Sequence, residues 1–285
     1  MKNSYEHLPE DKQEQLKRAA DIIVDTAKPD LLILFGSYAR GDWVEELAED
    51  GNYQYQSDFD LLAIVKNESL AKKIERKTSL NNRLGKLIRT PVSLIAEDIH
   101  FVNNKLSKGQ YFFTDILREG ILLHDSGKLE LAEPGVLHIN EIRQLATEDF
   151  DYWFNRAGGF LKMYYFALSE NELNIAAFNL HQVTEKLIAT MLLVFTRYKP
   201  KTHDLAKLLR ITASVNPEIL PIFPQGTQKE KDMFELLRKA YVDSRYNKEY
   251  TITAEELKWL CSRVLKLQEM TEQMCKEKIL SLNKE

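Results

Sequence analysis

Cysteine is scarce in this chain. Its 285 residues include two cysteines, Cys261 and Cys275, which fall in one stretch with helical periodicity. An intact helix would hold them roughly 21 Å apart, too far for a disulfide. With no other cysteine, neither a disulfide framework nor a thiolate zinc site can be built.

Long apolar segments are also missing. No apolar run approaches the roughly 20 residues of a membrane-spanning helix. The longest candidate, residues 187–195 (LIATMLLVF), fits a buried helix segment better. The first residues, MKNSYEHLPEDKQEQL, have no apolar core of the kind that a secretory signal needs. We therefore expect a soluble, cytoplasmic protein without a membrane partner.

Neither sign of charge dominates. The chain has 39 Lys and Arg against 43 Asp and Glu, which gives a formal net charge of −4. General binders of nucleic acid or anionic membranes are normally basic, so nucleic acid is not an expected partner, although a local basic groove is compatible with this charge. Hydrophobic residues make up 44% of the chain, which is enough to build real cores.

Residues 1–125 alternate helical patterns with short β-rich runs, which implies an α/β or α+β layer structure. Three runs have the length and branched apolar content of strands: residues 31–35, 59–65 and 91–97. Residues 68–88 read as one amphipathic helix. Its apolar positions are Leu70, Ile74, Leu80, Leu84 and Leu87.

Strand signals nearly vanish after residues 124–135, where Gly and Pro punctuate the chain. Helical patterns follow at roughly residues 141–169, 172–197, 202–214, 228–243 and 253–281. The last begins with a threonine cap, Thr251 or Thr253, followed by acids in its first turn. Residues 136–285 are therefore expected to form a second domain, an antiparallel helical bundle.

A Gly-Ser turn, Gly36-Ser37, follows the first predicted strand. Glycine lets a backbone approach a ligand closely, the serine hydroxyl can donate a hydrogen bond, and backbone amides at a helix start suit phosphate oxygens. The alternative is an ordinary turn, because Gly-Ser is common in turns.

Two aspartates, Asp58 and Asp60, begin the second predicted strand. Residues two apart on a strand project from the same face, so the two carboxylates point together while Phe59 and Leu61 point into the core. Paired carboxylates suit Mg²⁺, which takes one or two of them together with substrate phosphates and waters. The alternative is an edge strand or a turn with solvated acids.

These two motifs, GSYARG and SDFDLLAIV, resemble those of the nucleotidyltransferase superfamily related to DNA polymerase β. The second region resembles HEPN domains (higher eukaryote and prokaryote nucleotide-binding), in the stretches at residues 180–193, 199–209 and 241–250. The resemblance implies an α+β chain: a mixed sheet with flanking helices over residues 1–125, then an all-α antiparallel bundle over residues 136–285.

The resemblance also implies a mechanism. Asp58 and Asp60 would hold Mg²⁺ or Mn²⁺ against a nucleoside triphosphate, and Gly36, Ser37 and Arg40 would complete the nucleotide site. A hydroxyl on a small molecule or a protein would attack the α-phosphorus, and pyrophosphate would leave. The alternative function is a nucleotide-binding regulatory or toxin–antitoxin-like module with weak or no transferase activity.

One departure from the resemblance concerns a third carboxylate on the next strand. The matching residue is Ser93, which cannot replace a carboxylate as a base near neutral pH, so we expect slow turnover. Glu97 shares the face of Ser93 but lies roughly 13 Å further along the strand. Other candidates lie in the long connection, where residues 49–56 suit a hairpin or lid: Asp42, Glu45, Glu46, Glu49 and Asp50.

The other departure concerns ribonuclease activity, which many HEPN domains carry through an arginine followed several residues later by a histidine. Arg245 has no such histidine after it. Arg197 and His203 have the spacing but straddle a predicted loop, where His203 is expected to cap a helix or pack beside Asp204. A ribonuclease function is therefore not expected.

The HEPN half is instead interpreted as an acceptor or nucleotide pocket, formed by His181, Arg245 and Tyr246. His181 is read as a core or pocket histidine because no second histidine or cysteine sits at helical spacing. Tyr246 or Tyr250 could accept a nucleotidyl group, or both could simply pack the bundle. The dense aromatics of residues 150–166 make a homodimer a possible partner.

Overall fold

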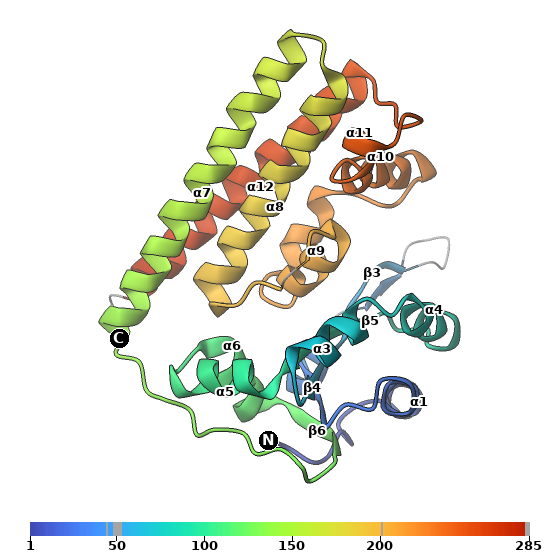
Figure 1. Ribbon diagram of the computed structural model, residues 1–285, viewed down its shortest axis with the longest axis vertical. Helices are drawn as coiled ribbons and strands as arrows, with labels where there is room; N and C mark the ends of the chain where they lie inside the picture. Colours follow the sequence, from blue (N-terminus) through green and yellow to red (C-terminus); the bar gives the residue numbers. More distant parts are fainter. Residues whose placement is uncertain (44, 48–52, 201, 283–285) are drawn as a thin grey trace. The chain divides into compact units, whose positions relative to one another are not determined.

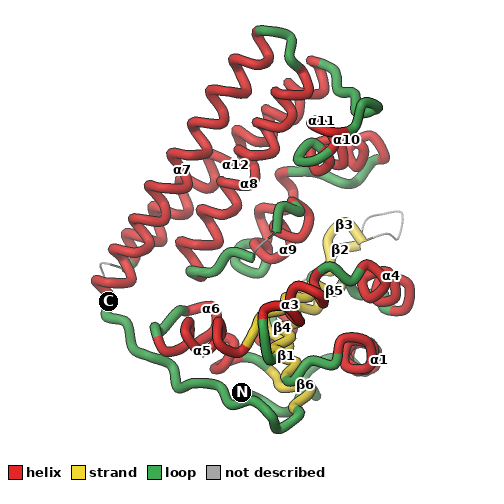
Figure 2. The backbone as a smooth tube through the Cα atoms, viewed as in Figure 1, coloured by secondary structure: helices red, strands yellow, loops and turns green. Residues whose placement is uncertain are grey.

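The computed structural model describes residues 1–43, 45–47, 53–200 and 202–282, without the side chains of residues 46, 47 and 53–56. The chain divides into two compact units, Met1–Leu137 and His138–Glu285 (Figure 1). The first combines strands with helices, and the second is helical (Figure 2).

A four-stranded mixed sheet forms the centre of the N-terminal unit. Its order is β5-β4-β1-β6, with β1 (Leu31–Phe35) antiparallel to β4 (Phe59–Val65) and β6 (Ile121–Asp125), and β4 parallel to β5 (Val92–Asp98). Every residue of β1 and β4 is buried, which explains why both are apolar throughout except at Asp60. The three predicted strands are confirmed, and β6 is an addition.

Helices cover both faces of this sheet. They are α1 (Glu10–Ala27), α2 (Ser37–Arg40), α3 (Glu68–Glu75), α4 (Thr78–Leu87), α5 (Ile99–Ser107) and α6 (Tyr111–Glu119). Leu16 and Ile23 of α1 share one hydrophobic cluster with Leu34 and Leu61 of the sheet. On the opposite face, Phe35 meets Phe112 of α6 edge-on, with their ring centroids 5.4 Å apart.

The single helix predicted over residues 68–88 is wrong, because the structure has two helices there. The Lys77 amide donates to the Ile74 carbonyl at 3.1 Å, and the Thr78 amide donates to the Arg76 carbonyl at 2.9 Å, which ends one helix and starts another. Leu70 and Leu87, expected on the buried face, are 40% and 39% exposed. The break reorients the second helix, so the apolar positions do not form one continuous stripe.

A small hairpin occupies part of the long connection between α2 and β4. It pairs β2 (Glu45–Leu47) with β3 (Tyr53–Gln56) in antiparallel register. The hairpin predicted at residues 49–56 thus begins earlier than expected, and residues 48–52 lie outside the described residues. β3 leads through Ser57 and Asp58 into β4.

The C-terminal unit is built around α8 (Leu173–Thr196), which packs on most of the other helices. These are α7 (Ile139–Ser169), α9 (Leu205–Ala213), α10 (Gln228–Lys239), α11 (Asp243–Tyr246) and α12 (Ala254–Ser281), with a 3₁₀ helix η1 at Pro217–Ile222. In Figure 1, α7, α8 and α12 run side by side. Sixteen of the 24 side chains of α8 are buried, so it forms the core of the predicted bundle.

Side-chain caps set several helix starts in this unit. Thr253, one of the two threonines proposed, begins α12 in a capping box with Glu256. Asp204 caps α9 by accepting from the Ala206 amide, which places its start at Leu205 rather than at residue 202. The five predicted helices are present, and α11 and η1 are additional.

Within the described ranges, no helix has both the length and the apolar character that crossing a bilayer requires.

Candidate functional site

The Gly36-Ser37 turn lies against Asp60. Gly36 ends β1 with φ 75° and ψ −155°, a conformation that side chains rarely permit. A Cβ atom at this position would also lie 2.5 Å from Asp60 Oδ2. Glycine is therefore required twice here, once for the backbone angles and once for the close approach to the carboxylate.

The turn continues into α2, whose last carbonyls are held by the N-terminal segment. His7 Nε2 lies 2.8 Å from the Tyr38 carbonyl oxygen, and Lys2 Nζ donates to the Ala39 carbonyl at 3.2 Å. With only the four residues Ser37–Arg40, α2 is too short to develop much of a helix dipole. Phosphate binding at this turn would therefore depend on the Ser37 hydroxyl, the backbone amides and the partly exposed Arg40.

Strand register brings Asp60 together with the neighbouring motif residues. Asp60 is the ladder partner of Phe35, directly before Gly36, and also of Ser93 on β5. Asp60 is 3% exposed, whereas Asp58, at the entrance to β4, is only partly buried. The turn thus lies at the end of β1, and Asp60 and Ser93 lie on the next two strands of the sheet, β4 and β5.

The electrostatics of Asp60 are unusual for a carboxylate. Burial raises the pKa of Asp60 well above its ordinary value, and the charge of Asp58 raises it further. The charge of Arg40 and the Ser93 hydroxyl oppose this shift but do not cancel it. Asp60 Oδ1 is buried without a hydrogen-bond partner in the described part of the chain. Such an oxygen is costly to bury unless a ligand satisfies it.

No third carboxylate joins this pair among the side chains that the structure describes. Ser93 occupies the position opposite Asp60, and Glu97 lies opposite Ile64, further along a β5 strand that stays in register. Glu97 is therefore wrong as a substitute for the third acid. Across the described residues, no group of three or more His, Cys, Asp or Glu side chains is placed to hold a metal.

The acids of the long connection do not fill the gap either. Asp42 accepts from Arg40 Nε at 3.0 Å and is exposed, and Glu45 is paired with Lys12. The side chain of Glu46 is not described, and Glu49 and Asp50 lie outside the described residues. The described site therefore has two carboxylates and one serine.

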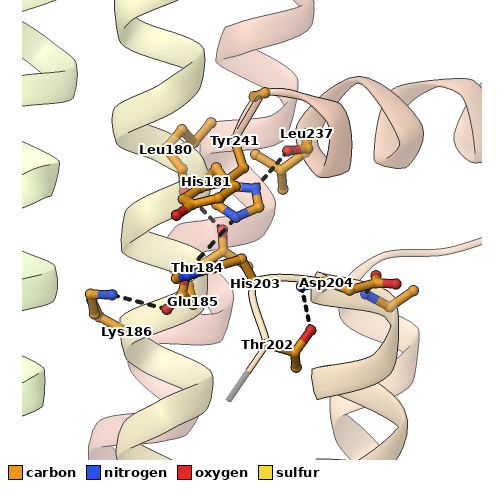
Figure 3. Close-up of polar contacts among 12 residues, drawn as sticks. Leu180, His181, Thr184, Glu185, Lys186, Thr202, His203, Asp204, Leu237 and Tyr241 are labelled. Atoms are coloured by element: carbon orange, nitrogen blue, oxygen red, sulfur yellow. Dashed lines mark hydrogen bonds and ion pairs between the residues drawn. The ribbon is translucent and has the colours of Figure 1, made fainter. Parts of the chain in front are cut away.

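A second polar cluster lies inside the C-terminal unit, centred on Glu185 of α8 (Figure 3). The Glu185 side chain is 1% exposed and, among the described residues, has four nitrogen atoms within 4 Å. His203 Nδ1 lies 2.8 Å from its Oε2, while Lys186 Nζ and Lys199 Nζ lie 3.0 Å and 3.7 Å from its Oε1. Burial would raise the pKa of Glu185, but the His203 hydrogen bond and the Lys186 charge outweigh it and lower the pKa.

His181 lies one helical turn before Glu185 and is fully buried. Its Nδ1 lies 3.0 Å from the Leu237 carbonyl oxygen, so the neutral ring must donate from this nitrogen. Its Nε2 lies 3.9 Å from Glu185 Oε2, too far for a hydrogen bond. Burial lowers the pKa of His181 to about 4, so the ring is neutral at pH 7 and belongs to the core.

His203 differs from its prediction. It neither caps a helix nor packs beside Asp204. Instead it binds Glu185 and stacks on Tyr241, with ring centroids 4.2 Å apart and planes 16° apart. A buried carboxylate on α8 is the stronger partner, because it lacks water and needs a donor. The i, i+4 spacing of His181 and Glu185 shows in the sequence that the two side chains share a helix face. No sequence pattern indicates the contact of His203 with Glu185.

The predicted pocket residues meet around Tyr241. Its ring centroid lies 5.3 Å from that of His181 and 4.8 Å from the Arg245 guanidinium. Arg245 Nε donates to the Tyr241 carbonyl at 2.8 Å, and its guanidinium also lies 5.0 Å from the ring of Tyr246. Tyr246 is 76% exposed. His181 and Arg245 thus share Tyr241 as a neighbour, and Tyr246 is joined to this group through Arg245.

Tyr250 is buried, which bears on its proposed role as an acceptor. It is 6% exposed, and its hydroxyl donates to the Leu236 carbonyl at 3.0 Å. Burial raises the pKa of Tyr250 above its ordinary value, which makes the phenol a poorer nucleophile. Of the two tyrosines, the exposed Tyr246 is the better candidate.

Comparison with known proteins bears on the C-terminal unit. The family model of the HEPN domain matches residues 150–275, a range that runs from within α7 to within α12 and includes the Glu185 cluster. A search of curated proteins found no match. The match does not reach the sheet or the Gly36-Ser37 turn. Residues 150–275 of this chain are a HEPN domain.

Proposed function

We propose that the N-terminal unit is a Mg²⁺-dependent nucleotidyltransferase. It transfers a nucleoside monophosphate from a nucleoside triphosphate to a hydroxyl on a small molecule or a protein. The observation that carries this proposal is Asp60, a buried carboxylate with one unsatisfied oxygen, pressed against a Gly-Ser turn. A fold that only needed a strand at this position would place an apolar side chain there, as it does at Leu62 and Ile64.

The donor set suits a hard divalent cation. Asp58, directly before β4, and Asp60, on β4, supply the oxygen ligands, and Mg²⁺ commonly takes one or two protein carboxylates with the rest of its shell from phosphates and water. The raised pKa of Asp60 fits this role, because a cation would restore the charged form that burial disfavours. A bound divalent cation would supply charge neutralisation to the triphosphate.

The chain's own residues bind and orient the donor. The Ser37 hydroxyl and the backbone amides of the turn can donate to the phosphate oxygens, and Arg40 adds a positive charge at the same turn. In the transfer, the acceptor oxygen bonds to the α-phosphorus while the bond from that phosphorus to the bridging oxygen breaks. The electron pair of the broken bond leaves with pyrophosphate, and the acceptor proton passes to solvent or to a base.

Ser93 limits the rate of this reaction. A serine hydroxyl near neutral pH does not accept a proton, and general-base help is typically worth roughly 10²–10⁴-fold in rate. The proposed enzyme therefore turns over slowly unless the acceptor supplies its own base.

The second candidate function is a nucleotide-binding regulatory module, of the kind found in toxin–antitoxin systems, with little or no transfer. Ser93 in place of an acid favours it, together with the lack of a three-acid cluster among the described residues. Both functions predict Mg²⁺-dependent triphosphate binding, and only the first predicts pyrophosphate release.

Calorimetric titration with ATP, with and without Mg²⁺, tests the shared part of both candidates. Wild type should bind in a Mg²⁺-dependent way, and Asp58→Asn and Asp60→Asn should abolish this dependence. Asp21→Asn, which changes an exposed aspartate of α1, is the matched control and should bind as wild type does. Equal binding by wild type and both site variants would reject the site.

A pyrophosphate-release assay then separates the two candidates. Release that needs Asp58 and Asp60 supports the transferase. Mg²⁺-dependent binding without release supports the regulatory module. Mass spectrometry of the chain after incubation with ATP and Mg²⁺ would show whether Tyr246 itself accepts a nucleotidyl group.

A further inference from the structure

The N-terminal unit contains a lysine, Lys12, whose ammonium group is buried in an ion pair. Lys12 of α1 is 5% exposed, and its ammonium donates to the Glu45 carboxylate and, at 2.9 Å, to the Thr90 hydroxyl. Glu45 also accepts from the Tyr38 hydroxyl at 3.2 Å. A buried ammonium is costly without its partner, so the ion pair holds Lys12 and Glu45, and the groups bonded to them, in fixed positions.

Two of these partners adjoin parts of the proposed nucleotide site. Tyr38 directly follows Ser37 in the Gly-Ser turn, and it is fully buried against Phe59, with ring centroids 4.7 Å apart. Thr90, which is also fully buried, precedes Ser93 by three residues at the start of β5. The lysine therefore connects the segment after the turn with the segment before Ser93.

Glu45 supplies the third connection. It lies on β2, where its ladder partner across the hairpin is Gln56 of β3, two residues before Asp58. Because β3 runs through Ser57 into β4, fixing Glu45 also fixes the approach of the chain to Asp58 and Asp60. Through Tyr38, the hairpin and Thr90, the ion pair is thus connected to the turn, to the aspartates and to the strand of Ser93.

We propose that Lys12 and Glu45 are positioning residues for the nucleotidyl-transfer site. They hold the three segments at the spacing that the triphosphate and the acceptor require. This inference rests on the proposed function and deepens it by naming how that site is kept in register. Misplacement of a reacting group by about 1 Å can cost roughly 100-fold in rate, so small movements of these segments matter.

A buried ion pair could also serve the fold alone, and the variants are chosen to distinguish the two roles. Lys12→Met/Glu45→Leu removes both charges, a change that often leaves stability unaltered because no unpaired charge remains. Lys17→Met/Glu14→Leu makes the same changes at exposed residues of α1 and is the matched control. Glu45→Gln keeps an acceptor for Tyr38 and removes only the charge, as a milder variant.

Three measurements are made on the full chain: hydrogen exchange, the Mg²⁺ midpoint for ATP binding, and pyrophosphate release. In Lys12→Met/Glu45→Leu we expect faster exchange in peptides covering residues 36–40 and 57–60, at a Tm close to that of wild type. The Mg²⁺ midpoint should rise several-fold, and release should fall by roughly 10- to 100-fold. Glu45→Gln should show smaller changes in the same direction, and the control should match wild type.

Faster exchange with an unchanged Mg²⁺ midpoint and unchanged release would overturn the proposal, because the pair would then serve the fold only. Unchanged exchange would overturn it as well. If the double variant does not fold, Glu45→Gln decides by the same three readouts. If wild type and Asp60→Asn bind ATP and Mg²⁺ equally, the proposed function itself fails. In that case hydrogen exchange on the apo chain shows only whether the pair orders these segments.

Discussion

Replacing Gly36 by alanine tests the contact on which the candidate site depends. The new Cβ would lie 2.5 Å from Asp60 Oδ2, and the backbone would keep φ near 75°. Neither problem can be relieved locally, because the turn is fixed by β1 on one side and by α2 on the other. Gly36→Ala should therefore destabilise the N-terminal unit and weaken Mg²⁺-dependent ATP binding.

The cost has two parts. A non-glycine residue in this backbone region costs roughly 1–3 kcal/mol. Pushing the Asp60 side chain off its preferred rotamer adds roughly 0.5–1.5 kcal/mol. The sum is about 1.5–4.5 kcal/mol, and at about 4 °C per kcal/mol for a unit of this size the Tm should fall by roughly 6–18 °C.

Differential scanning calorimetry of the full chain measures this shift, and Gly85→Ala is its control. Gly85 lies inside α4, and a Cβ there would have no neighbour within 4 Å. That substitution should raise the stability of the same unit by roughly 0.5–1 kcal/mol, since alanine suits a helix better than glycine. The two alanine variants should thus move one transition in opposite directions.

A double-mutant cycle with Asp60→Ala separates the two parts of the cost. In the Asp60→Ala background the clash is gone and only the backbone penalty remains, so Gly36→Ala should cost less there than in wild type. An unchanged or raised Tm in Gly36→Ala would refute the strained turn. An equal cost in both backgrounds would refute the contact with Asp60.

Asp60→Asn should raise the Tm of the metal-free chain. The Tm difference from wild type should grow as pH rises from about 4, because wild type loses stability between the pKa of Asp60 in the unfolded chain and its raised pKa in the folded chain. A Tm difference that stays constant across pH would contradict this. Ser93→Asp should lower the metal-free Tm and increase the stabilisation by Mg²⁺. It should also raise the rate of pyrophosphate release by about tenfold or more. A variant that is no faster than wild type would show that a missing base does not limit the rate. Wild type should lose about 3 kcal/mol of stability as pH falls from 6.5 to 4, because unfolding lets His181 bind a proton that its folded pKa of about 4 resists. Urea unfolding at pH 7 and pH 4 should show a smaller loss in His181→Gln but not in the exposed control His100→Gln, and equal losses in all three proteins would refute the buried neutral ring.

The strands beside the site could be predicted from the sequence because burial on both faces makes them apolar at every position except Asp60. β1 and β4 match the predicted residues 31–35 and 59–65 for this reason. β6 was missed because only Ile121 of its five residues is fully buried, so its pattern is too weak to separate from the preceding helix. The break between α3 and α4 has a signal in the spacing from Ile74 to Leu80, because six residues on a continuous helix would place the two side chains about 120° apart.

The site was predictable to the extent that its residues are close in sequence. The Gly36-Ser37 turn and the paired aspartates stand out as motifs, and Ser93, singled out through the family resemblance, is the ladder partner of Asp60 in the sheet. The ion pair of Lys12 with Glu45 spans 33 positions, and no sequence pattern indicates it: Lys12 belongs to no motif, and Glu45 stands out only as a candidate third acid. The contact appears only once the hairpin and α1 are placed in space.

The buried course of α8 has a consequence for how this protein is made. On a ribosome, α8 is complete at Thr196, but α12, one of its main packing partners, begins only at Ala254. At roughly 5–20 residues per second, part of the apolar surface of α8 waits about 3–12 seconds for its cover. During that interval α7, α9, α10 and α11 can pack on α8, but the apolar surface that α12 covers stays exposed on each nascent chain. Truncations that remove α12 should therefore aggregate during synthesis rather than yield a smaller folded bundle.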